Sequence, residues 1–145
     1  MSLSPRSSSS VDADSAAPRL DVVCLCAEWC GTCRDYRQVF DELQAGAPGH
    51  HFRWIDIEDE ADALGDIDIE TFPTLLLAWR GVVLFAGPVL PRLGEAQRLL
   101  TVQVERVALW LASGTAPAQP VLAGLPADQL DAFVELARQL PSAQR

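Results

Sequence analysis

Two cysteines separated by two residues are the strongest chemical feature of the sequence. They lie in the segment Trp29-Cys30-Gly31-Thr32-Cys33, after a short apolar run and before a stretch with helical spacing. The first cysteine of such a pair lies at a helix N-terminus, where unpaired N–H groups and the helix dipole favour a thiolate. One helical turn brings the second thiol back within bonding distance. One thiolate can then attack a substrate disulfide, and the other can resolve the mixed disulfide.

The remaining two cysteines, Cys24 and Cys26, lie two residues apart in a predicted strand and therefore face the same side of it. A free cysteine is commonly a small buried hydrophobic residue, and this is the interpretation we favour. The alternative is a metal or cluster site formed by all four cysteines, because four thiolates can ligate zinc or an iron–sulfur cluster. Such a site would need the strand pair to turn toward the helix terminus. We therefore predict no metal ligands and no cofactor.

Alternating strands and helices are expected to position these cysteines. Apolar and β-branched runs predict strands, whereas Tyr36, Phe40 and Leu43 share one face of a predicted helix. The predicted order is strand 21–27, helix 30–44, strand 52–58, short helix 59–65, strands 74–79 and 82–86, and helix 93–112. Arg80-Gly81 indicates a hairpin between the last two strands. This order predicts an α/β fold with parallel strands followed by an antiparallel hairpin.

The two ends of the chain differ in composition from its centre. Residues 1–18 are rich in serine and lack the apolar stretch of a secretory signal, so we expect a disordered tail and a cytoplasmic protein. After Ser113, a Pro-, Gly- and Ala-rich stretch is typical of a linker, and an amphipathic helix follows. Its apolar positions are Leu130, Phe133, Val134, Ala137 and Leu140. We expect this helix to cover apolar surface of the domain rather than to bind a partner or a second copy.

Composition and charge exclude several classes of function. All 11 basic residues are arginine, and the net charge is −9. A domain this acidic lacks the positive surface that holds phosphate backbones, so nucleic-acid binding is not expected. No apolar run approaches the roughly 18 residues of a membrane helix, so no membrane span is expected. The acidic stretch from Asp56 to Glu70 lacks the glycine-centred pattern of a calcium loop and is interpreted as a solvated face.

Three segments of the sequence resemble the thioredoxin family. They are residues 27–33 (AEWCGTC), 54–58 (WIDIE) and 72–77 (FPTLLL), followed by Gly87, in the family's order and spacing from about residue 21 to residue 112. The resemblance implies a thioredoxin-like α/β fold with a central mixed sheet and flanking helices. The family's opening strand and helix are not identifiable, and an extra C-terminal helix is added. The predicted organisation is a tail at 1–18, a thioredoxin-like domain at 19–113, and a linker with the extra helix at 114–145.

This resemblance also implies an activity. The chain would be a protein-disulfide oxidoreductase in which Cys30 is the attacking thiolate and Cys33 the resolving thiol. A cis peptide bond would precede Pro73. The substrate-binding surface would consist of Trp29, Gly31, Thr32, Phe72, Pro73 and Gly87. Expected partners are proteins with disulfides and a thioredoxin reductase or another dithiol donor. The rival hypothesis is a non-catalytic binding or chaperone-like module with the same fold.

The sequence departs from the family's pattern at positions that bear on the chemistry. By spacing, Cys24 stands where the family carries a buried aspartate, and Trp54 stands where it carries a lysine. Thr32 replaces the usual proline between the paired cysteines, which suggests a less strongly reducing couple. Without the family's opening strand, residues 52–58 are predicted to form an edge of the sheet.

Overall fold

The computed structural model describes residues 18–27, 29–69, 71–115, 121–122 and 125–141. The serine-rich tail predicted at 1–18 therefore lies outside the described residues, apart from Pro18, which is buried. Among the helices in these ranges, none combines the length and apolar character that crossing a bilayer requires.

A mixed sheet forms the centre of the molecule. Its strands are β1 (Asp21–Cys26), β2 (His51–Asp56), β3 (Thr74–Trp79), β4 (Val82–Pro88) and β5 (Val121–Leu122), in the spatial order β2-β1-β3-β4-β5. β1 pairs parallel with β2 and antiparallel with β3, and β3 and β4 form the predicted antiparallel hairpin. All six residues of β1 are buried. Within the described part of the chain β2 lies at one edge of the sheet, as the sequence predicts.

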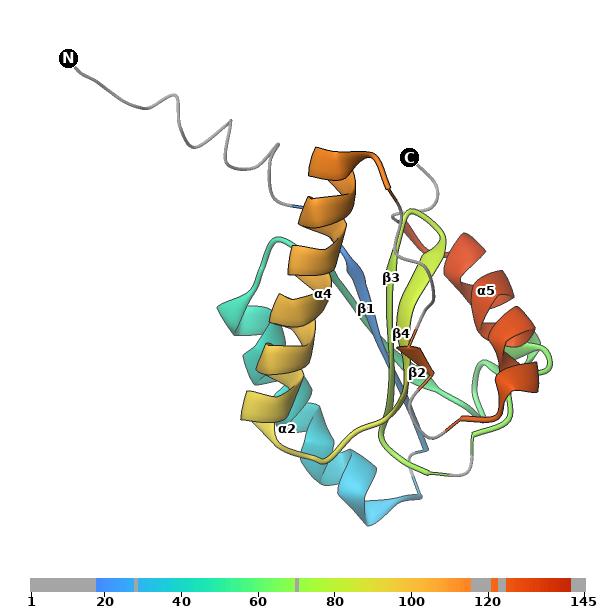
Figure 1. The fold of residues 1–145 in the computed structure, drawn as a ribbon. Helices are drawn as coiled ribbons and strands as arrows, with labels where there is room; N and C mark the ends of the chain where they lie inside the picture. Colours follow the sequence, from blue (N-terminus) through green and yellow to red (C-terminus); the bar gives the residue numbers. More distant parts are fainter. Residues whose placement is uncertain (1–17, 28, 70, 116–120, 123–124, 142–145) are drawn as a thin grey trace.

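Helices cover both faces of this sheet (Figure 1). α2 (Gly31–Gly46) and α4 (Leu93–Ser113) lie on one face, whereas the short α3 (Ala61–Leu64) and α5 (Leu130–Arg138) lie on the other. A hydrophobic core lies on each face of the sheet, and because side chains alternate along a strand, β1 contributes residues to both cores. Val22, Cys24 and Cys26 face α2 and α4, and Val23 and Leu25 face α5.

The apolar spacing of α2 explains its orientation. Its buried residues Cys33, Tyr36, Phe40 and Leu43 recur every three or four positions and so form one face toward the sheet. The helix ends at Gly46, shortly before Pro48, which cannot continue it without losing a hydrogen bond. This packing fixes the first turn of α2 against the end of β1.

The C-terminal helix covers apolar surface, as predicted. Phe133 and Leu136 of α5 are buried against Val23, Leu25 and Ile55 of the sheet. The predicted linker before this helix contains a short strand, because β5 pairs parallel with β4, and a 3₁₀ turn (Ala127–Gln129) then precedes α5. Backbone groups at the outer edge of β4 need hydrogen-bond partners, and this short segment supplies them.

The loop before β2 contains a partly buried hydrogen bond to a histidine side chain. The Nδ1 atom of His50 accepts a hydrogen bond of 3.0 Å from the N–H of Leu20, immediately before β1. Burial, and to a lesser extent the nearby His51 and Arg19, lower the pKa of His50 below its ordinary value of 6.5. Only the neutral imidazole can accept this bond.

We expect His50 to make stability fall with acidity. Above pH 6.5 the imidazole is neutral in both the folded and unfolded chains, so its contribution is fully present. As the pH falls below 6.5, the unfolded chain takes up the proton first, and stability is lost until the lower folded pKa is passed. Urea melts of wild type and His50→Asn at several pH values test this, since asparagine can accept the same bond without titrating. Parallel pH profiles of the two proteins would contradict the prediction.

Candidate active site

Cys30 lies at the N-terminus of α2. It is the N-cap residue, with extended backbone angles (φ −87°, ψ 123°), and its N–H donates a 3.0 Å hydrogen bond to the carbonyl of Ala27. Its own carbonyl accepts a 3.2 Å bond from the N–H of Arg34. The Cys30 thiol is free and only partly buried. The predicted position at a helix terminus is therefore confirmed, and this thiol can be reached from solvent.

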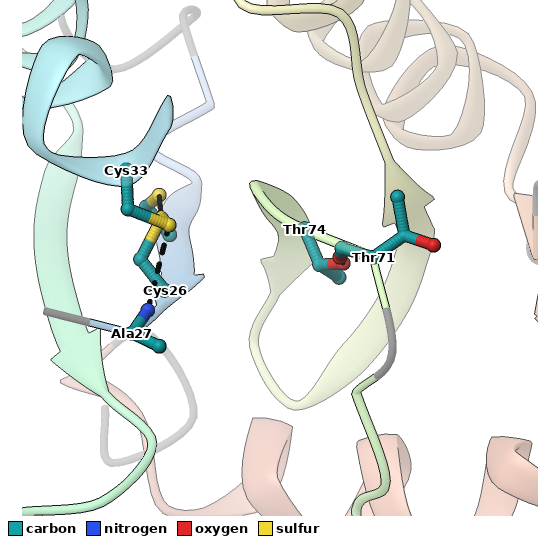
Figure 2. The surroundings of a disulfide bond; sticks show 6 residues. Cys26, Ala27, Cys33, Thr71 and Thr74 are labelled. Atoms are coloured by element: carbon teal, nitrogen blue, oxygen red, sulfur yellow. Dashed lines mark hydrogen bonds between the residues drawn. A yellow bond between two sulfur atoms is a disulfide. The ribbon is translucent and has the colours of Figure 1, made fainter. Parts of the chain in front are cut away.

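A disulfide joins Cys26, at the end of β1, to Cys33, in the first turn of α2 (Figure 2). Their Cα atoms are 5.7 Å apart, and the two residues are 0% and 1% exposed. The N–H of Ala27 also donates to the Cys33 sulfur, at 3.4 Å. The prediction that Cys26 is only a small hydrophobic residue is wrong in this respect: it is buried, but it is covalently bonded.

This bond bears on the predicted chemistry of the Cys30–Cys33 pair. Cys33 can form one disulfide at a time, and in this structure its partner is Cys26. Exchange between Cys30 and Cys33 therefore remains a prediction, and the structure describes a state in which Cys30 is a free thiol. The sequence pattern favoured the shorter pairing because only two residues separate Cys30 and Cys33. The packing of α2 on β1 brings a second partner to Cys33.

Cys24 lies beside this disulfide in the buried layer under α2. Its thiol donates to the Cys26 sulfur at 3.9 Å, and burial raises its pKa well above the ordinary range, with a smaller opposing effect from Arg37. Cys24 is paired in register with Trp54, whose ring lies 5.8 Å from that of Phe40 and 4.9 Å from the Arg37 guanidinium carbon. A thiol and an indole thus occupy adjacent strand positions at which the resemblance to the thioredoxin family predicts a carboxylate and an amine.

Trp29 contributes an exposed apolar surface next to Cys30. It is 61% exposed, and its ring meets that of Phe72 edge to face at 5.6 Å. Its Nε1 donates a 3.1 Å hydrogen bond to the Glu58 carboxylate. Sequence reasoning missed this role of Glu58, although the residue lies within the family-like segment at 54–58. This hydrogen bond therefore links the indole ring to the loop that follows β2.

The other predicted substrate-binding residues lie in two places. Gly31 and Thr32 are exposed in the first turn of α2. Pro73 is buried, its peptide bond with Phe72 is cis, and its carbonyl accepts a 3.0 Å bond from the N–H of Val89. Gly87 is buried and lies opposite Leu75 in the β3–β4 ladder. In the turn before β3, the Thr74 hydroxyl donates to the Thr71 carbonyl at 2.7 Å (Figure 2).

The four cysteines are bonded differently from what the four-cysteine metal hypothesis requires. Among the described residues no three Cys, His, Asp or Glu side chains are placed to hold a metal ion together. Two of the four sulfurs that the hypothesis requires are joined to each other.

We expect alkylating reagents to discriminate between the two free thiols. Brief treatment with iodoacetamide near neutral pH should label Cys30 and leave Cys24 unlabelled. Cys30 is partly exposed, whereas Cys24 is fully buried and its raised pKa keeps it a thiol rather than the reactive thiolate. Mass mapping before and after unfolding in urea tests this, because unfolding should make Cys24 reactive as well. Preferential labelling of Cys24 in the folded protein would contradict the prediction.

Comparisons with known proteins show similarity in sequence and in fold. The thioredoxin family model matches residues 10–86. A Streptomyces coelicolor protein provisionally named thioredoxin 2 is 30% identical over 80 residues, which is 50% of this chain and 60% of that protein. This chain therefore spans less than two thirds of the length of its curated relative.

Solved structures share the fold. Thioredoxin from Fasciola hepatica superposes with a TM-score of 0.54 at 19% identity, covering 66% of this chain and 93% of that one. Oxidised thioredoxin from Plasmodium falciparum gives a TM-score of 0.52 at 19% identity, covering 65% and 91%. At this level of identity the likeness establishes the fold, a mixed sheet with flanking helices to which this chain adds a C-terminal helix.

Proposed function

Since the chain belongs to the thioredoxin family, we propose that it is a thiol–disulfide oxidoreductase that reduces protein disulfides through Cys30. The observation that carries the proposal is a free, partly exposed thiol at the N-terminus of α2, next to an exposed tryptophan. Unpaired N–H groups at a helix N-terminus stabilise negative charge on such a sulfur. A thiolate there can be reached by a partner, whereas the other three cysteines are buried.

The proposed reaction has two exchange steps. The Cys30 thiolate attacks one sulfur of a client disulfide, forms a mixed disulfide and releases the first client thiolate. The Cys33 thiolate then attacks the Cys30 sulfur, forms the Cys30–Cys33 bond and releases the second client thiolate. The client gains two electrons and the protein loses two. A dithiol donor, such as a thioredoxin reductase, is proposed to return them in a reducing compartment such as the cytoplasm.

The proposed docking surface surrounds Cys30 with apolar side chains. Trp29 and Phe72 present their rings edge to face beside the cysteine, and the hydrogen bond from Trp29 to Glu58 restricts the indole. A client strand is proposed to lie across these rings and the backbone beside Pro73. The acidic residues that follow β2, together with the net charge of −9, favour neutral or basic clients over acidic ones.

One observation favours the non-catalytic alternative. While Cys33 is bonded to Cys26, Cys30 has no resolving thiol. Its thiolate can still attack a client disulfide, form a mixed disulfide and release one client thiolate, but the second step cannot follow. A binding module would remain in that state. An oxidoreductase would pass through a state in which Cys33 is free.

Reduction of insulin by dithiothreitol, followed by precipitation of the B chain, tests the proposal. Wild-type protein should accelerate precipitation in proportion to its concentration, and Cys30→Ser should return the rate to that of dithiothreitol alone. The Cys24→Ser variant is a useful comparison, because it also removes one thiol but none that the two steps use. No acceleration by wild type would contradict the oxidoreductase and leave the binding module.

A further inference from the structure

Cys26 is one of the two cysteines that the proposed two-step reaction does not use, and it is the one bonded to Cys33. Resting on the proposed function, we propose that Cys26 is a third redox-active cysteine. By internal exchange it replaces Cys30 as the disulfide partner of Cys33. The oxidised protein then contains a buried Cys26–Cys33 disulfide and a free Cys30 thiol.

The position of Cys33 allows two partners. It lies in the first turn of α2, three residues after Cys30, and its Cα atom is 5.7 Å from that of Cys26 at the end of β1. The Cα atoms of disulfide-bonded cysteines are usually about 4.4–6.8 Å apart, so the strand–helix packing already holds Cys26 and Cys33 in bonding range. Cys33 is thus the sulfur shared by a surface partner and an interior partner.

The exchange step balances without an external oxidant. The Cys26 thiolate attacks the Cys33 sulfur of the Cys30–Cys33 disulfide. The Cys26–Cys33 bond forms, the Cys30–Cys33 bond breaks, and Cys30 leaves as a thiolate. The proton lost by Cys26 balances the proton that Cys30 takes up when it becomes a thiol. No electrons enter or leave the protein, and one disulfide is present before and after the step.

Two contacts around the interior disulfide support this step. The Cys24 thiol donates to the Cys26 sulfur at 3.9 Å, and burial keeps Cys24 protonated by raising its pKa. It can therefore stabilise a Cys26 thiolate when the bond opens. The N–H of Ala27 donates to the Cys33 sulfur at 3.4 Å and can stabilise negative charge there. Cys24 acts in this scheme as a positioning residue.

Burial limits which molecules can react with the Cys26–Cys33 disulfide. Cys26 and Cys33 are 0% and 1% exposed, so a bulky disulfide or thiol reaches them through Cys30. In the interior-oxidised form Cys30 can still form a mixed disulfide, but Cys33 cannot resolve it until Cys26 releases it. The internal bond would therefore convert a two-thiol reductase into a single-thiol form that retains its client.

The sequence around the cysteines makes this linkage measurable. Trypsin leaves all four cysteines in one peptide, residues 20–34, and cleavage after Glu28 divides it into 20–28 and 29–34. The reduced full-length protein is oxidised with glutathione disulfide, quenched in acid, alkylated and digested with both proteases. We expect peptides 20–28 and 29–34 to be joined, with Cys26 and Cys33 unalkylated and Cys30 carrying the alkyl group.

Variants distinguish internal exchange through Cys30 from direct formation of the Cys26–Cys33 disulfide without Cys30. In Cys26→Ser the joined peptides should disappear and peptide 29–34 should carry an internal disulfide. Cys24→Ala should still give the joined pair but form it more slowly, because the thiol that stabilises the Cys26 thiolate is absent. In Cys30→Ser the pair should form at least about tenfold more slowly, because the entry point is lost. If the Cys26–Cys33 disulfide formed equally fast in Cys30→Ser, the proposed exchange would be overturned. Oxidised wild type whose main product is the internal disulfide of 29–34 would overturn it as well. Failure of the insulin assay would contradict the proposed function instead, whichever linkage is found.

Discussion

Replacing Cys33 with serine is expected to make the protein accumulate a mixed disulfide with insulin chains. The attacking Cys30 remains, but the thiol that should release the client is absent, so the first exchange step is completed and the second is not. Cys30→Ser should form no such adduct, because the partly exposed thiol itself is lost. Intact-mass measurement after acid quenching and non-reducing gels provide the two readouts.

The controls for this trap follow from the cysteine cluster. In Cys33→Ser the Cys26 thiol also loses its partner, so the double variant Cys26→Ser/Cys33→Ser shows whether Cys26 attacks the adduct. We expect equal trapping by the single and double variants, because neither exchange step of the proposed reaction uses Cys26. Equal, low adduct formation by Cys33→Ser and Cys30→Ser would contradict the assignment of Cys30 as the attacking thiol.

The main elements of the fold could be predicted because each has a strong local signal. Apolar runs gave β1 and β3 to within one residue at each end, and α2 follows the spacing of Tyr36, Phe40 and Leu43. The hairpin was predicted from Arg80-Gly81, and both residues have positive φ angles (50° and 82°). Glycine adopts such angles without steric cost, whereas arginine does so only where the strand pairing holds it there. In contrast, β5 has only two residues and pairs with a strand that is far away in the sequence, so the residues of β5 carry too little pattern to identify it as a strand.

The site was predictable in position but not in its bonding. The helix-terminal location of Cys30 follows from the local order of strand and helix. The partner of Cys33 depends on how closely α2 packs on β1, and that distance is a tertiary property. Alternation along β1 predicted that Cys24 and Cys26 share one face, and they do. The sequence could not reveal that this face is the one that meets the first turn of α2.

The buried layer under α5 is expected to contribute a large share of the stability. Leu136 is 2% exposed and packs with Phe133 on the face of the sheet opposite α2. Leu136→Ala should lower the free energy of unfolding by about 2–5 kcal/mol, through lost apolar burial and the cavity that remains. Proteins of this size are stable by only about 5–15 kcal/mol, so a marked fall in the urea midpoint is expected.

The same substitution on another helix provides a matched control. Leu109 of α4 is 68% exposed, so Leu109→Ala removes the same atoms from a position where they bury little surface. Its effect should stay within about 0.5 kcal/mol. Urea melts of the reduced proteins, monitored by circular dichroism, compare both variants with wild type without a contribution from the disulfide. If Leu136→Ala cost no more than Leu109→Ala, α5 would not unfold together with the sheet. Another segment would then have to cover the face of β1 that bears Val23 and Leu25, because all six residues of this central strand are buried from water.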